Sequence, residues 1–135
     1  MIRVVRLGSP RAPGEGLRLG TVRRPPRGVP KSQWASRGFY DVWVPDLAPS
    51  EALLKQGRIA EDERAWKTFV RRYRAEMKRP EAARLLALLA TFSRGSDFSV
   101  GCYCENEARC HRSVLRELLK EHGADMVPAA RESAR

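Results

Sequence analysis

The sequence contains no run of about 20 apolar residues, the length that a helix needs to cross a bilayer. Its first residues, MIRVVRLGSP, lack the apolar stretch and the small-residue cleavage site of a secretory signal. Acidic residues are scarce in the first part of the chain, because residues 1–37 hold nine basic side chains and one acid, Glu15. These absences predict a cytoplasmic protein with a basic N-terminal segment and no membrane partner.

Several common catalytic motifs are also missing. The chain has no Walker motif, no dinucleotide-binding glycine-rich turn, no G-x-S-x-G and no H-E-x-x-H. A phosphatase-type loop is excluded by spacing, because four residues separate Cys104 from Arg109 and six separate Cys102 from Arg109. The glycines of a phosphate-binding loop are absent as well.

Cysteine is sparse, and all three thiols, Cys102, Cys104 and Cys110, fall within nine residues. An odd number of cysteines in a reducing compartment argues against a disulfide framework. Catalysis, metal binding or a redox role stays possible, beside simple burial as small hydrophobic residues. Cys102 alternates with Phe98 and Val100 along a strand-like segment, so its side chain is expected in the core.

The 135 residues, 42% of them apolar, suffice for one core. We therefore expect a single domain over residues 1–127 and a flexible tail over 128–135. The net charge of +10 attracts polyanions, so the expected partner is an anionic ligand, a nucleotide or nucleic acid. Composition assigns no cofactor and no oligomeric state.

Hydrophobic patterning predicts strands that alternate with helices. Strands are expected at 2–7, 17–22, 39–44, 97–104 and 125–127, and helices after Ser50, over 61–78, from Pro80 and over 108–122. This order predicts an α/β fold, a compact domain with a mainly parallel sheet flanked by helices in a Rossmann-like three-layer arrangement. Residues 23–38 are too rich in proline and glycine for a regular element and are expected to form a basic loop.

The segment 101–112, GCYCENEARCHR, runs from the end of a strand into a helix, where α/β proteins bind ligands. The helix N-terminus favours an anion and lowers the pKa of a thiol, which makes Cys110 a candidate nucleophile. His111 is a candidate acid or base, and Arg109 and Arg112 suit phosphate.

A zinc site is the alternative for the same segment, since C-x-C-x5-C-H offers four ligands. It lacks the paired C-x2-C of common structural sites. Neighbouring Cys110 and His111 also diverge by roughly 100° if both are helical. The sequence therefore assigns no metal.

The basic loop supplies a second candidate, with Arg23, Arg24 and Arg27 directly after the strand at 17–22. In a parallel sheet this loop leaves on the same edge as the cysteine-rich turn, so the two are expected to form one pocket. A merely solvated basic loop is the alternative. Trp34 and Phe39 or Tyr40 can stack a base or attach the loop to the core.

Four ordered segments carry a resemblance to a known family: RRPPRGVPK, DLAPSEALLK, W-x2-F-x2-RYRAEM and CYCENEARCHR. Together they resemble the domain of unknown function 488 (DUF488) family, in particular its YeaO-like branch, over about residues 3–127. The resemblance implies a compact α/β domain with a parallel-type sheet. It also implies that both loops form the family signature, whose positions here are Arg23 or Arg24, Pro26, Arg27, Cys102 or Cys104, Glu105, Cys110, His111 and Arg112.

The chain departs from the YeaO-like pattern at VRRPPRG, where an acidic residue and a bulky aromatic often precede Pro-Arg-Gly. An acid role for that loop is therefore not expected. The family name records no established activity, so the resemblance implies a fold and a site without a reaction.

The favoured function is binding of a phosphate-bearing ligand, a nucleotide or nucleic acid, with possible enzymatic activity. The ligand-binding candidates are Arg23, Arg24, Arg27, Arg109 and Arg112. Any chemistry is assigned to Cys110 and His111, with Cys104 and Glu105 in support. The alternatives are a thiol enzyme or redox sensor with Cys110 as nucleophile and Cys104 as resolving partner, a zinc protein using Cys102, Cys104, Cys110 and His111, and a binding module without chemistry.

Overall fold

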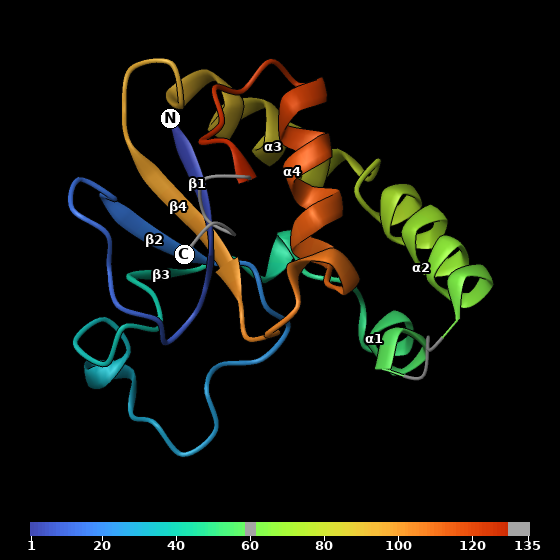
Figure 1. The fold of residues 1–135 in the computed structure, drawn as a ribbon, viewed down its shortest axis with the longest axis horizontal. Coiled ribbons are helices and arrows are strands. Elements are labelled where there is room, and N and C mark those ends of the chain that lie inside the picture. The colour runs from blue at the N-terminus through green and yellow to red at the C-terminus, as the bar shows by residue number, and fades with distance from the viewer. Residues whose placement is uncertain (59–61, 130–135) are drawn as a thin grey trace.

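A computed structural model describes residues 1–58 and 62–129 of the chain. Its centre is a sheet of four parallel strands in the order β1-β4-β2-β3. The strands are β1 (Ile2–Arg6), β2 (Leu17–Gly20), β3 (Val42–Trp43) and β4 (Phe98–Cys102). The expected α/β fold with a parallel sheet is confirmed (Figure 1). Residues 130–135 of the expected tail lie outside the described part.

All five expected strands are shorter than the sequence predicts, and two of them are reduced to one or two residues. The segment 39–44 pairs with β2 only at Val42–Trp43. The Phe39 amide instead bonds to the Trp34 carbonyl of its own loop at 3.0 Å, and Pro45 opens the 3-10 helix η2 (Pro45–Leu47). At 125–127 the chain forms a single bridge, Met126 to Ile2, rather than a strand.

The helices are α1 (Glu51–Arg58), α2 (Glu63–Glu76), α3 (Pro80–Phe92) and α4 (His111–Glu121). The Ser50 hydroxyl accepts the Leu53 amide at 3.3 Å, as expected of the residue before α1. Asp62 caps α2 through the Ala65 amide at 2.7 Å. Gly123 follows α4 with a φ of +88°, the left-handed conformation that ends helices.

The sheet presents two different faces. Val4, Val100 and Leu19 lie in register across β1, β4 and β2 and join the core formed with the helices. Figure 1 shows α3 and α4 beside the sheet and α1 and α2 farther out. The opposite face carries Arg18 and Ser99 in register and is covered by loop residues. There the buried Arg18 guanidinium bonds to the Ser9 and Gly38 carbonyls and to the Glu15 carboxylate.

The last helix begins later than the expected residue 108. A short 3-10 helix, η3 (Glu107–Arg109), comes first, started by the Asn106 side chain, which accepts the Ala108 amide at 3.0 Å. Cys110 then adopts an extended conformation, φ −124° and ψ 150°, and α4 starts at His111. Within the described residues, no helix combines the length and apolarity needed to cross a bilayer.

Candidate functional site

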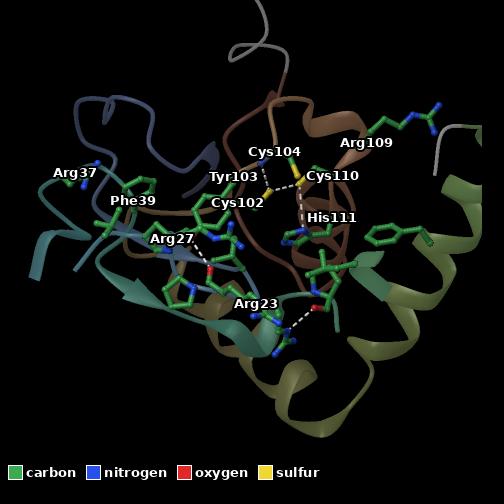
Figure 2. Close-up of a pocket in the computed structure, with 18 of the residues that line it drawn as sticks. Arg23, Arg27, Arg37, Phe39, Cys102, Tyr103, Cys104, Arg109, Cys110 and His111 are labelled. Carbon is green, nitrogen blue, oxygen red and sulfur yellow. Dashed lines mark hydrogen bonds between the residues drawn. The ribbon is translucent and has the colours of Figure 1, made fainter. Parts of the chain in front are cut away.

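The site lies where the loops that follow β2 and β4 meet. Because β2 and β4 are parallel neighbours, both loops leave the sheet at the same edge. They line a cavity of about 760 Å³, together with residues of α1 and α2 (Figure 2). The prediction that the basic loop and the cysteine-rich turn form one pocket is confirmed.

Three potential metal ligands converge at this pocket. The ligand atoms of Cys102, Cys110 and His111 all lie within 4.8 Å of one another, and all three side chains are buried. The Cys102 and Cys110 sulfurs are 2.6 Å apart, and Cys110 Sγ lies 3.8 Å from His111 Nδ1. The expected divergence of Cys110 and His111 is wrong, because Cys110 is extended and precedes the helix instead of belonging to it.

The tautomer of His111 follows from its environment. Its Nε2 lies 2.7 Å from the Thr21 carbonyl oxygen, which can only accept, so Nε2 carries the proton. The unprotonated Nδ1 therefore faces Cys110. Burial lowers the pKa of His111 to about 4, so the ring is neutral at pH 7.

The thiols differ in exposure and in acidity. Cys104 is exposed, and hydrogen bonds from the Cys102 and Cys110 thiols lower its pKa well below the ordinary value. The hydrogen bond with Cys102 lowers the pKa of Cys110. The hydrogen bond to Cys104 and burial together outweigh it and raise this pKa to about 11. Hydrogen bonds to Cys104 and Cys110, together with burial, raise the pKa of Cys102 as well. The more acidic thiol is thus Cys104 and not the sequence candidate Cys110.

Two arginines of the basic loop have partners within the protein. Arg23 donates to the carbonyl oxygens of Pro45, Ala48 and Pro49 at 3.1–3.2 Å. Arg24 forms an ion pair with Glu51 at the start of α1. Both side chains line the pocket, but the Arg23 guanidinium is bound to the β3–α1 connection and the Arg24 guanidinium is paired with α1.

Arg27 and Arg37 differ from these two. Both are exposed and line the pocket, and neither side chain has a hydrogen-bond or ion-pair partner among residues 1–58 and 62–129. Arg37 was not among the sequence candidates. Its position in the sequence, at the end of the same basic loop and beside Gly38 and Phe39, could have identified it as a candidate ligand-binding residue.

The arginines of the cysteine-rich turn also have separate places. Arg109 lines the pocket, bonds to Glu63 at 2.7 Å and lies over the Trp66 ring at 5.6 Å from its centre. Arg112 is buried and outside the pocket lining, where its Nη2 donates to the Cys104 carbonyl at 2.6 Å. Arg112 therefore holds the turn.

Glu105 pairs with Arg6 at 3.4 Å at the surface. The Thr21 carbonyl, rather than Glu105, positions His111.

Aromatic rings form a large part of the pocket wall. Phe39, Trp66, Phe69 and Tyr103 all line it, and Trp66 stacks on Phe69 at 5.3 Å. Trp66 and Phe69 belong to α2 and were not among the sequence candidates for the site. Trp34 lies outside the lining and packs edge-on against the buried Tyr40 at 5.0 Å, so it attaches the loop to the core.

A comparison with family models identifies the chain. Residues 2–123 match the model DUF488-N3a, described as the active DUF488-N3 subclade. The chain belongs to the DUF488 family. The match covers both loops of the pocket, and it leaves the YeaO-like branch unconfirmed. No curated protein and no solved structure matches this DUF488 chain.

Proposed function

We propose that this DUF488 protein binds a nucleotide, free or as a unit of nucleic acid, with the phosphate at Arg27 and Arg37. The observation that carries the proposal is a pair of exposed guanidiniums on the rim of an aromatic-walled pocket, neither of which has a partner among residues 1–58 and 62–129. A guanidinium presents paired N–H donors that match phosphate oxygens.

The pocket has the size and lining for such a ligand. Its volume of about 760 Å³ falls within the range of small-molecule sites, roughly 300–1,000 Å³. The rings of Phe39, Trp66 and Tyr103 offer flat apolar surface for a base, and base–aromatic stacking contributes about 1–3 kcal/mol. A ligand with one flat apolar part and one anionic part therefore uses both features of the wall.

Isothermal titration calorimetry tests the proposal, with ATP, inorganic phosphate and a short single-stranded oligonucleotide as separate probes. We expect ATP or the oligonucleotide to bind, with affinity that falls as salt rises. Arg27→Ala and Arg37→Ala should each weaken binding by about tenfold, the loss expected for one charge-assisted hydrogen bond.

Arg71→Ala is the matched control, because Arg71 is exposed on α2 and outside the pocket lining. It removes the same charge and should change affinity less than about twofold. An equal loss of affinity in all three variants would mean that only the net charge of the protein matters. That result would contradict a phosphate site at Arg27 and Arg37. Binding of phosphate alone as tightly as ATP would contradict the role of the aromatic wall.

A further inference from the structure

The buried cluster of Cys102, Cys110 and His111 forms one end of the pocket wall. We propose that these three residues bind one zinc ion in a tetrahedral site whose fourth position opens to the pocket. Thiolate and imidazole are the ligands that zinc prefers, and carboxylates, which would favour magnesium or calcium, are absent from the set. The proposal does not depend on the anionic ligand.

The imidazole is oriented as a ligand. A metal-bound histidine usually donates its other ring N–H to a carboxylate or backbone carbonyl, which fixes the tautomer. In His111 the Thr21 carbonyl takes this role at 2.7 Å and leaves the Nδ1 lone pair toward Cys110 Sγ, 3.8 Å away. The neutral ring is the form that binds a metal.

Backbone amides support both thiolates. The Cys104 amide donates to Cys102 Sγ at 3.4 Å, and the Arg112 amide donates to Cys110 Sγ at 3.5 Å. Hydrogen bonds from N–H groups stabilise a sulfur that carries negative charge. The second donor belongs to the first turn of α4, where the helix dipole adds to the effect.

The charges of the proposed site balance. Two thiolates, a neutral imidazole and one divalent ion sum to zero, which avoids the cost of an uncompensated buried charge. Zn–S bonds of about 2.3 Å hold two sulfurs roughly 3.8 Å apart in a tetrahedron. The Cys102 and Cys110 sulfurs, 2.6 Å apart, must therefore separate by about 1 Å when the ion enters.

The fourth position faces the pocket. Cys102, Cys110 and His111 all belong to the pocket lining. Cys104 is exposed, and its sulfur stays outside the group of mutually close ligand atoms found among the described residues. Three protein ligands with one open position are typical of catalytic zinc, whereas structural zinc has four.

Cobalt(II) titration of the fully reduced, metal-stripped protein tests the site through absorption spectra. We expect one equivalent to bind, with the visible bands of tetrahedral cobalt and a thiolate charge-transfer intensity that corresponds to two sulfurs. Zinc should displace the cobalt. These results need only the wild-type chain, so they stand even if a variant fails to fold.

Single substitutions then assign the ligands. Cys102→Ser, Cys110→Ser and His111→Ala should each weaken zinc binding by more than about 100-fold, beyond the 10–100-fold that outer-shell changes cost. His122→Ala is the matched control for His111→Ala, because His122 is exposed and outside the pocket lining, and it should keep the zinc affinity. Cys104→Ser should keep the two-sulfur intensity. Circular dichroism of each variant separates loss of ligand from loss of fold.

Three results would overturn the proposal. The first is failure of the reduced wild-type protein to bind cobalt or zinc stoichiometrically. The second is a three-sulfur intensity that falls in Cys104→Ser, which would close the fourth position. The third is a Cys102–Cys110 disulfide, detected by mass spectrometry, in a protein that binds no metal after reduction.

Discussion

The imidazole of His111 donates a hydrogen bond from Nε2 to the carbonyl oxygen of Thr21, 2.7 Å away and 90 residues distant in sequence. This bond joins His111, where the loop after β4 ends and α4 begins, to Thr21, which directly follows β2. Both His111 and Thr21 are buried. This hydrogen bond therefore links the two loops that line the pocket.

His111→Ala should reduce the free energy of unfolding by about 2–4 kcal/mol, because it removes this bond and leaves a cavity beside the Tyr73 ring. Urea denaturation of the metal-free protein measures the loss. His122→Ala is the control, since His122 is exposed and should change stability by less than about 0.5 kcal/mol. Equal effects of both substitutions would contradict the assigned role of the His111–Thr21 bond.

Arg23→Ala should destabilise the protein by about 2 kcal/mol, because its guanidinium donates to three backbone carbonyls of the β3–α1 connection. Arg27→Ala should leave stability within about 0.5 kcal/mol, since Arg27 is exposed and has no partner within the described part of the chain. Thermal melting of the two variants at equal concentration distinguishes them. A larger loss in Arg27→Ala than in Arg23→Ala would reverse the assignment of structural and ligand-facing arginines.

Glu15→Gln should cost about 3 kcal/mol at pH 7, as expected when a buried ion pair with Arg18 is broken. Burial alone would raise the pKa of Glu15, but hydrogen bonds from Arg18, Ser99 and the Ala12 amide lower it from 4.5 to about 2. The folded state thus binds this proton less readily than the unfolded state, so the contribution is complete above pH 4.5 and disappears as the pH falls toward 2.

Urea unfolding followed by tryptophan fluorescence between pH 7 and pH 3 measures this dependence. The stability difference between wild type and Glu15→Gln should shrink as the pH falls. Glu105→Gln is the control, because the Glu105 side chain is 83% exposed. A difference that stays constant with pH would rule out the lowered pKa of Glu15.

Gly20→Ala should destabilise the protein by about 1–3 kcal/mol, because an added methyl group would lie 2.2 Å from the Tyr40 ring. Tyr40 is completely buried and supports the loop through Trp34. Gly95→Ala meets no atom within 4 Å and should be nearly neutral. Chemical denaturation of both variants provides the measurement, and a neutral Gly20→Ala would mean that Tyr40 moves freely.

Elements with local signals were predictable from the sequence. The helix predicted over 61–78 forms as α2, with Phe69 and Tyr73 on its buried face, and the helix predicted to end at 122 ends at Glu121, two residues before the left-handed Gly123. The strand predicted at 17–22 forms over Leu17–Gly20, although its polar Arg18 is buried and its apolar Leu17 is exposed. That inversion arises from Glu15, Ser9 and Gly38, which satisfy the guanidinium on the loop-covered face.

The start of the last helix was less predictable, and the consequence concerns the site. A helix that included Cys110 would direct its thiol away from His111. Asn106 caps the 3-10 helix η3, and the extended Cys110 precedes α4. Local sequence preference does not distinguish these two starting points for the helix. Because α4 begins at His111 and not at 108, the Cys110 thiol lies near the His111 imidazole instead of diverging from it.

The sequence by itself determined the α/β class, the family and the two segments that carry the site, because periodicity, turn residues and ordered motifs are local. Tertiary structure alone decided which arginines are engaged, since Pro45, Ala48 and Pro49 satisfy Arg23 while Arg27 and Arg37 have no partner in the described part of the chain. It also decided the tautomer of His111, because the Thr21 carbonyl belongs to the loop after β2, 90 residues away in sequence. Such contacts depend on the order of strands across the sheet, in which β2 lies beside β4. No local sequence pattern specifies that order.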